Sequence, residues 1–471
     1  MIPLETPFRL DDAERKKILE LALSRGGEFA EIFAEYRLFN FINMEEEIIK
    51  ETAESVSLGL GIRVISGERT GYGYTNDLSF EKIKKTALTA ASIADSGKTL
   101  SIPLFRKTPG REGLYPLDRP AHQVSLKDKI DLVRRAYLAC QQVDPKIQKV
   151  KVLFQDHIQA VFIVNSEGQT AEDTRPQVKL ICTAVAEKGG RREFGFSGGG
   201  GRVGLEYFER VLTPEKIGGE AAEEALRLLE AVEAPAGEMV VVLAPGHAGV
   251  LVHEAVGHLV EADFNRKKTS IFWDKLGQKV GSPLLTIYDD PTRPSFRGSY
   301  SIDDEGTLPA KTLLIDRGIV HSFLQDRLSA RLMDRELTGH GRRQDYTCIP
   351  IPRMSNTYVD RGQDDPEEIL RSVTKGIYAE RFEGGQVEDS GKFTFSISAG
   401  YLIEGGRLTA PIKQATLIGT NIDILRKIEM IGSDLEFGLQ TGTCSKEGQE
   451  VPVTDGCPTI KISKMTVGGQ R

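Results

Sequence analysis

The chain has 471 residues, a length that indicates two or three domains at roughly 150 residues each. Its 61 Lys and Arg residues against 68 Asp and Glu residues leave a net charge of −7, which argues against a dedicated nucleic-acid-binding protein. Five widely spaced cysteines exclude a disulfide framework and favour a reducing, cytoplasmic environment. The N-terminus is not typical of a signal peptide, and no apolar run is long enough to span a membrane.

Helices and strands alternate in the first half of the sequence. Asp11 and Glu14 form a capping-box pattern before a helical apolar spacing that stops at Gly26. We expect helices at about 12–23, 79–94, 125–140 and 213–232, and strands at 29–44, 55–75, 148–165 and 174–197, with a hairpin turn at 66–68 within the second of these strand segments. The glycine run 198–201 lacks the lysine and the spacing of a phosphate-binding loop, so a tight turn or mobile loop is expected there.

The second half is richer in short strands. The segment 234–237, Ala-Pro-Ala-Gly, is the best linker candidate, and 239–244 is a buried-strand run. After one helix, strands are expected at 284–289, 297–302, 312–324, 355–359, 393–403, 407–418 and 458–466, with helices at 365–378 and 421–427. The predicted fold class is α+β with two domains: an N-terminal α+β domain (1–235) and a β-rich C-terminal domain (236–471).

The helix after the linker contains the pattern His253-Glu254-x-x-x-His258. Two imidazoles one turn apart can bind one metal ion, and a neighbouring glutamate can accept a proton from activated water. The usual spacing is i and i+4, whereas i and i+5 turns the second ring about 140° away on a regular helix. The hypothesis therefore requires a π-bulge or a break at Gly257.

A catalytic zinc site commonly has three protein ligands. The third ligand could be another histidine, Glu261, Asp263 or a cysteine, and Glu261 could instead position His258. Cys444 lies in a Gly-flanked turn with Lys446 nearby, a cation that would favour the thiolate. Spacing alone does not choose between Cys444 and Cys457.

The segment HEAVGHLVEADFNRK resembles the metal-site helix of the TldD/PmbA family, and specifically of its TldD-type metallopeptidase subunit. Further blocks are similar as well: GIRVISGERTGYGYT, GSYSIDDEG, PRMSNTYVDRG, ATLIGTNIDIL and TGTCSKEGQ. The resemblance runs from about residue 29 to the C-terminus and is weaker across 100–235.

This resemblance implies a two-domain protomer with Zn²⁺-dependent peptidase activity. It implies that His253, His258 and Cys444 bind the metal and that Glu254 is the catalytic glutamate. It also implies unfolded peptides or protein segments as substrates, and a dimer, either of identical chains or with a PmbA/TldE-type subunit that lacks the metal residues. We expect neither a nucleic acid nor a membrane among the partners.

Two further matters stay open from the sequence. An oxyanion formed during hydrolysis needs a hydrogen-bond donor, for which Tyr401, Tyr300, His340 and His247 are unranked candidates. The alternative functions are a non-catalytic partner subunit of a peptidase complex, as in proteins called gyrase modulators, and a metallohydrolase acting on small molecules.

Overall fold

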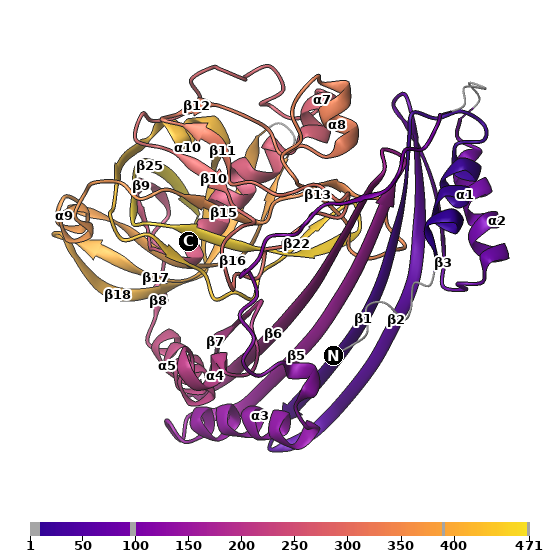
Figure 1. Ribbon diagram of the computed structural model, residues 1–471. Coiled ribbons are helices and arrows are strands. Elements are labelled where there is room, and N and C mark those ends of the chain that lie inside the picture. The colour runs from indigo at the N-terminus through magenta and orange to yellow at the C-terminus, as the bar shows by residue number, and fades with distance from the viewer. Residues whose placement is uncertain (1–9, 95–99, 389–390, 469–471) are drawn as a thin grey trace.

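The N-terminal half of the protein is built on one curved sheet of seven strands (Figure 1). The computed structural model describes residues 10–94, 100–388 and 391–468. The strand order is β3-β2-β1-β5-β6-β4, with β7 paired to β6, and all pairings except that of β4 with β6 are antiparallel. The strands are β1 Phe29–Glu45, β2 Ile48–Ser66, β3 Arg69–Thr75, β4 Arg106–Lys107, β5 Ile147–Asn165, β6 Gln169–Lys188 and β7 Arg191–Gly201.

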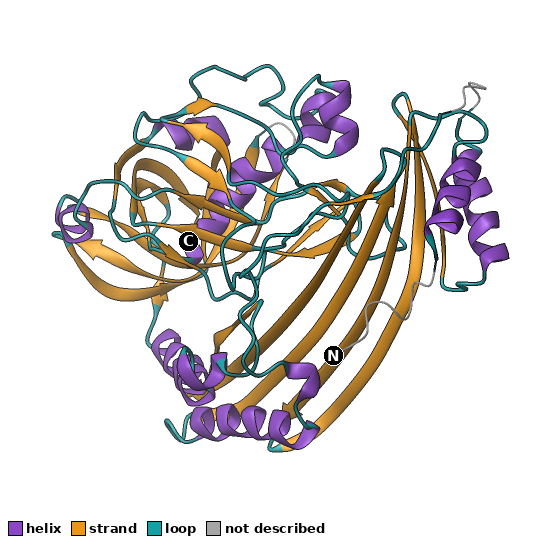
Figure 2. Ribbon diagram, in the orientation of Figure 1, coloured by secondary structure: helices purple, strands orange, loops and turns teal. Residues whose placement is uncertain are grey.

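Helices cover one face of this sheet near its two ends (Figure 2). They are α1 Asp12–Ala22, α2 Phe80–Ala91, α3 Leu126–Gln141, α4 Tyr207–Arg210 and α5 Pro214–Leu229, with a short 3₁₀ turn η1 at Ala121–Gln123. The predicted capping box of Asp11 and Glu14 is confirmed at the start of α1. Side chains alternate along β1, so Ile32 packs under the helices while Phe33 faces the C-terminal half.

Two sheets form the C-terminal half. The larger one has the order β16-β9-β25-β19-β17-β18-β8, and a further β16–β17 pairing closes it on itself. Its strands are β8 Val232–Glu233, β9 Gly237–Leu243, β16 Lys375–Val387, β17 Lys392–Glu404, β18 Arg407–Lys413, β19 Ala415–Thr420, β20 Ile428–Ile431 and β25 Ile460–Gly468. The second sheet comprises β10 Ile287–Asp289, β11 Thr312–Asp316, β12 Ile319–Val320, β15 Asn356–Val359, β21 Glu436–Phe437 and β24 Thr454–Cys457.

The remaining elements are short. Two small hairpins pair β13 Gly341–Arg342 with β14 Ile351–Pro352, and β22 Thr443–Lys446 with β23 Gln449–Pro452. The helices are α8 Arg327–Leu332, α9 Pro366–Arg371, α10 Asn421–Arg426 and the interrupted helix at 247–266 that is described below. Among the described residues, no helix combines the length and apolarity that crossing a membrane requires.

The predicted fold class, α+β with more than one domain, is confirmed, but two N-terminal expectations are wrong. Residues 174–197 are not one strand, because Gly189 and Gly190 adopt positive φ and form a hairpin between β6 and β7. The glycine run 198–201 is neither a turn nor a mobile loop but the buried end of β7. A Cβ at Gly200 would lie 2.1 Å from the Val178 carbonyl oxygen, so the glycines allow close approach of neighbouring backbone.

Four C-terminal expectations also need correction. The strand expected at 312–324 is two short antiparallel strands, β11 and β12, separated by a turn at Arg317 and Gly318, which have positive φ. The helix expected at 365–378 ends at Arg371, because 375–387 forms β16 beside β9. The strand expected at 407–418 is divided at Gln414, which has a positive φ of 54°. Residues 297–302 form turns and bends rather than a strand, since their backbone N–H groups donate to side chains, as Gly298 does to Asn356, or to nearby turn carbonyls, as Ser299 does to Phe296.

Buried ion pairs join the N-terminal sheet to the C-terminal half. Arg63 on β2 lies 2.9 Å from Glu31 on β1 and 2.5 Å from Glu305 of the C-terminal half. Arg343 adds a 2.6 Å contact to the other oxygen of Glu31. All four side chains are almost completely shielded from solvent, so each charge depends on its partners.

We therefore expect Arg63→Ala to lower the free energy of unfolding by about 3–5 kcal/mol, because it removes the ion-pair partner of the buried Glu305 and leaves the buried Glu31 with Arg343 alone. Arg192→Ala is the control, since Arg192 pairs with Glu187 at an exposed surface and the loss should be about 0–1 kcal/mol. Urea unfolding followed by circular dichroism measures both changes. Equal losses of unfolding free energy in the two variants would contradict the prediction that the buried ion pairs stabilise the fold more than the exposed pair does.

A second prediction concerns Glu35, a buried carboxyl group of β1. Burial raises its pKa from 4.5 to about 7, although Gln159 and the Tyr346 N–H donate to it. The folded state keeps a proton that the unfolded chain releases in this interval, so this group makes stability fall as pH rises from 4.5 to 7.

Replacing Glu35 with Gln removes that proton release. The stability of Glu35→Gln relative to wild type should therefore increase by about 3 kcal/mol between pH 4 and pH 8. Parallel denaturation curves at the two pH values measure the change, and any constant effect of the amide cancels. A difference that does not vary with pH would contradict the prediction.

Candidate metal centre

The helix that carries the His-Glu-x-x-x-His pattern is interrupted at that pattern. It consists of a 3₁₀ turn (η2, His247–Gly249), one α-helical turn (α6, Val250–Val252), a π-helical turn (η3, His253–Gly257), a second 3₁₀ turn (η4, His258–Val260) and α7, Ala262–Arg266. The backbone N–H of His258 donates to the carbonyl of His253, the i to i+5 bond of a π-turn. The irregularity that the spacing required is therefore present.

Glycine at position 257 has a steric reason. A Cβ added there would lie 1.9 Å from Met354 Sδ, a side chain without solvent exposure. The wider π-turn thus packs its backbone directly against the core. This packing holds the turn in the register that brings both histidines to one side.

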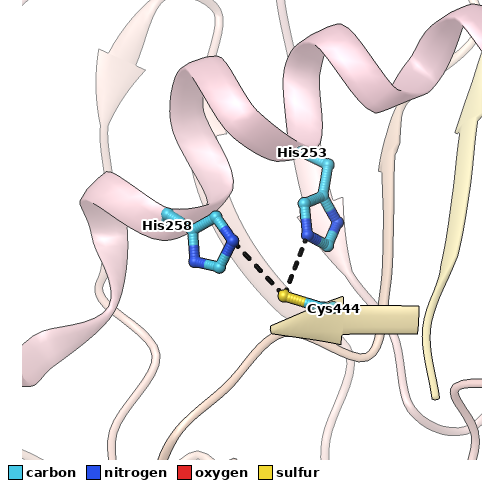
Figure 3. A group of neighbouring side chains, drawn as sticks. All are labelled: His253, His258 and Cys444. Atoms are coloured by element: carbon cyan, nitrogen blue, oxygen red, sulfur yellow. Dashed lines mark hydrogen bonds between the residues drawn. The ribbon is translucent and has the colours of Figure 1, made fainter. Parts of the chain in front are cut away.

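Three side chains that could hold a metal ion meet at this turn (Figure 3). Cys444 Sγ lies 3.3 Å from His253 Nε2 and 3.3 Å from His258 Nε2. The two imidazole centroids are 5.2 Å apart and the rings are nearly perpendicular, at 86°. The structure therefore brings together residues that are separated by most of the C-terminal half.

The hairpin of β22 and β23 presents Cys444 to the helix. Cys444 pairs with Val451 across the hairpin, and both side chains are buried. The guanidinium of Arg353, which has no solvent exposure, donates to the Cys444 carbonyl at 2.6 Å and to the Gln449 carbonyl at 3.0 Å. Arg353 therefore fixes the backbone of both strands at the level of the thiol.

Carboxylates orient the two imidazoles from behind. His253 Nδ1 lies 2.7 Å from Asp455 Oδ1, and His258 Nδ1 lies 3.0 Å from Glu261 Oε2. A carboxylate on Nδ1 keeps the proton there and directs the Nε2 lone pair away from it. Both Nε2 atoms point to the side where Cys444 lies, and each can act as a ligand there once a metal ion displaces its proton.

The two acidic residues after His258 share one cation. Lys446 Nζ lies 3.0 Å from Glu261 Oε2 and 2.7 Å from Asp263 Oδ1. Burial raises the pKa of Glu261, but Lys446 and then His258 outweigh it and lower this pKa to about 2. Glu261 thus contacts a histidine, whereas Asp263 contacts the lysine that supports Glu261.

The cluster favours a thiolate. Burial raises the pKa of Cys444, but the positive fields of His258 and His253 outweigh it and hold this pKa well below its usual value. Conversely, burial lowers the pKa of His258, but Glu261 and Cys444 outweigh it and raise this pKa to about 10. A thiolate is the form of cysteine that binds metals.

The donor set and its spacing fit a tetrahedral zinc ion. Bonds of about 2.3 Å to sulfur and about 2.0 Å to nitrogen at a tetrahedral angle place S and N roughly 3.5 Å apart. The observed 3.3 Å separations are close to this value. Mixed nitrogen and sulfur donors also favour zinc over harder cations.

Glu254 lies beside the cluster without joining it. Its Oε2 is 3.9 Å from His258 Nε2, and 29% of its side chain is exposed, against 3% for His253. Solvent therefore reaches the carboxylate directly next to the imidazole of His258, which is itself partly exposed. This is a suitable position for a group that exchanges protons with water.

Other candidates from the sequence lie elsewhere. The hydroxyl of Tyr401 accepts from Arg227 at 2.7 Å, in a cavity whose lining does not include the cluster. Cys457 Sγ lies 3.3 Å from the Ala244 carbonyl oxygen, and the ring of His340 is held by Asp289 and Thr338. Tyr300 donates to the Gly339 carbonyl, so each of these groups already has another contact.

Sequence reasoning missed Asp455 and Arg353. Asp455 reaches His253 because β24, which carries it, pairs in parallel with β15 beside the interrupted helix. Neither residue stands in a motif with recognisable ligand spacing. The PRMSNTYVDRG block, which includes Arg353, marked this region but gave no reason to assign that residue a role at the metal cluster.

The fold and the candidate metal cluster are those expected of a metallopeptidase family, and comparisons with known proteins identify that family. Sequence models of the PmbA/TldA metallopeptidase match domain 1 at residues 30–94, the central domain at 119–229 and the C-terminal domain at 236–469. The chain belongs to the PmbA/TldD metallopeptidase family. A metalloprotease TldD homolog of Haemophilus influenzae is 40% identical, with 99% of this chain and 98% of that protein covered.

Two more distant relatives are also named metalloproteases. A metalloprotease of Methanocaldococcus jannaschii is 35% identical over 94% of this chain and 96% of its own length. A zinc metalloprotease TldD homolog of Saccharolobus solfataricus is 27% identical over 96% and 99%, respectively.

Solved structures share the fold. A Thermotoga maritima protein whose name refers to modulation of a DNA gyrase matches with a TM-score of 0.79 and 23% identity, covering 97% of this chain and all of its own. TldE from Thermococcus kodakarensis matches with a TM-score of 0.74 and 19% identity, again covering 97% and 100%.

The geometry predicts which cysteine matters for metal binding. We expect Cys444→Ser to lose most of the bound zinc, because a neutral hydroxyl replaces the thiolate between two imidazoles. Cys457→Ser should keep the metal and serves as the matched control. Elemental analysis of the purified variants measures zinc per chain, and circular dichroism checks that both are folded. Equal zinc in wild type and Cys444→Ser would exclude this cluster as the site.

Proposed function

We propose that the protein is a zinc-dependent peptidase that hydrolyses unfolded peptides or protein segments. The observation that carries this proposal is the meeting of Cys444 Sγ with both histidine Nε2 atoms at 3.3 Å, with the Glu254 carboxylate beside them. The family and the names of the curated relatives support a metallopeptidase.

In this proposal His253, His258 and Cys444 hold the ion, and Glu254 handles the proton. A zinc ion bound there would supply Lewis acidity, polarising a scissile carbonyl and lowering the pKa of water. Glu254 accepts the proton of the attacking water at its carboxylate and then delivers it to the leaving amine. Asp455 and Glu261 keep their histidines in the binding orientation throughout.

The burial of the cluster supports unfolded substrates. His253 and Cys444 are 3% and 5% exposed, so a peptide bond in a folded domain could not reach them without local unfolding. An extended segment can present its backbone to such a buried site and can also pair with a strand edge. We therefore propose recognition of backbone more than of particular side chains.

We further propose that the protein works as a dimer, either of identical chains or with a PmbA/TldE-type subunit. The fold shared with TldE supports this proposal, since two subunits of one fold can present similar surfaces to each other. Light scattering after size-exclusion chromatography, with and without such a subunit, tests it. A catalytically active monomer would contradict it.

We expect Glu254→Gln to lower kcat/KM for an unfolded peptide by about 10²–10⁴-fold, because the amide cannot accept the proton. Zinc content should stay at the wild-type level, since Glu254 is not among the ligands. Glu54→Gln, which changes an exposed glutamate on β2, is the control and should leave turnover unchanged.

The assay uses the zinc-loaded protein and follows cleavage of an unfolded protein and its folded form by mass spectrometry. Chelation should abolish cleavage, and added zinc should restore it. Full turnover by Glu254→Gln would favour the non-catalytic partner function, and faster cleavage of the folded form would contradict the substrate class.

A further inference from the structure

A second, strongly basic cavity lies between the N-terminal sheet and the C-terminal half. Its volume is about 380 Å³, and it opens to solvent beside Lys179, Phe39 and Glu450, which are partly or fully exposed. Its floor is the sheet face opposite the helices. The side chains that form this floor come from three neighbouring strands: Arg37 and Phe39 on β1, Gln155, His157 and Gln159 on β5, and Arg175, Gln177 and Lys179 on β6.

The strand register makes this floor continuous. Gln159 pairs with both Arg37 and Arg175, and His157 pairs with Gln177. Alternate residues of a strand share a face, so the polar residues at every second position form one patch. A sheet face covered by another part of the chain is normally apolar, and a local departure of this kind often marks a functional site.

The C-terminal half adds buried guanidinium groups as the roof. Arg297 donates to the Gly442 carbonyl at 2.7 Å and to Thr443 Oγ1 at 3.2 Å. Arg342 donates to the carbonyl oxygens of Met354 and Pro452 at 2.5 and 2.9 Å. Both arginines are at least 94% buried and use part of their N–H groups to hold the backbone around β22 and β23.

Positive charge in this cavity exceeds the available carboxylates. Asp304 is already bound by Arg175, at 2.6 Å, and by the backbone of Arg343, and the other carboxylate of the lining is the exposed Glu450 at the opening. Among the described residues, no ion pair within 4.0 Å is found for five cations of the lining: Arg37, Lys179, Arg202, Arg297 and Arg342. Buried charges without counter-ions are costly, which makes an anionic ligand favourable here.

The pKa values of two cations in the lining agree with this excess of positive charge. Burial, followed by the like charges of Arg202, Arg37 and Arg342, lowers the pKa of Arg297 to about 9. Burial and then Arg297 lower the pKa of Lys179 to about 8. Each shift reflects a positive group that lacks sufficient negative charge nearby.

We propose that this cavity binds carboxylate groups of the peptide substrate, and so gives the enzyme a preference for acidic segments or for a free C-terminus. The inference rests on the proposed peptidase function. Paired guanidinium groups bind carboxylates through two hydrogen bonds, and the amide of Gln155 suits a peptide group between them.

The position of the cavity relative to the cluster supports a substrate role. Thr443 and Pro452, which pair across the β22–β23 hairpin, line the cavity. Cys444 is the next residue after Thr443, and its side chain points to the opposite face of the strand. One hairpin therefore separates the two sites, and under the proposal one extended substrate reaches both.

The test measures binding to the full-length, zinc-loaded Glu254→Gln protein, which should bind peptides without cleaving them. A fluorescently labelled Glu-rich peptide and its Gln-substituted counterpart are compared by anisotropy, each with a free and an amidated C-terminus. We expect the Glu-rich peptide to bind about tenfold more tightly, with a smaller gain for the free C-terminus if the terminal carboxylate also enters.

Arg37→Gln and Lys179→Gln remove unpaired cations without altering the hairpin, and each should reduce this preference severalfold. Lys149→Gln changes an exposed lysine of β5 outside the cavity and should preserve it. Equal binding of all peptides would overturn the proposal. Displacement by inorganic phosphate together with equal peptide binding would also overturn it and would assign the cavity to small inorganic anions.

This experiment separates the inference from the function on which it rests. Preference for acidic peptides in a protein whose wild type cleaves none of them would refute the peptidase proposal and leave the cavity assignment standing. Cleavage that ignores peptide charge in the wild type, with equal binding in Glu254→Gln, would refute only the cavity assignment.

Discussion

The contact of one cysteine with two imidazoles is the constraint on which the functional region depends. It requires His253 and His258 to face the same side, which a regular helix forbids at this spacing, so the chain adopts a π-turn. The turn needs room for its backbone against Met354, and glycine at 257 provides that room. The contact also requires the strand that carries Cys444 to be fixed in position. The buried Arg353 does this by donating to the carbonyl oxygens of Cys444 and Gln449.

The same constraint explains the charges around the cluster. A buried thiolate with two imidazoles is stable only if negative charge also lies next to the outer ring nitrogens, and Asp455 and Glu261 supply that charge. Glu261 is itself buried, so it requires Lys446, and Lys446 in turn contacts Asp263. Each charge is thus balanced by the next one outward. Loss of an outer residue would consequently disturb the orientation of an inner one.

Local patterns could be predicted from the sequence, whereas contacts between distant parts of the chain could not. The capping box of α1 and the need for an irregular helix at Gly257 follow from near neighbours in the sequence, and both are present. The selection of Cys444 over Cys457 required the family resemblance, because spacing says nothing about which distant strand reaches the helix. Asp455 was missed for the same reason: its place depends on the parallel pairing of β15 with β24. The glycine run 198–201 was misread because its close contacts belong to other strands.

The N-terminal sheet shows a further limit of periodicity, and this limit bears on function. Alternation in β5 and β6 correctly indicates one apolar and one polar face, but a polar face is not necessarily a wet one. Here it is covered by the C-terminal half, and charged residues such as Arg63 and Arg343 carry much of the contact between the two halves. Near Arg297, this interface contains more cationic side chains than carboxylates to balance them. Its electrostatic energy therefore depends on which anions enter, and a substrate that supplies carboxylates would also strengthen the packing of the sheet against the hairpin that carries Cys444.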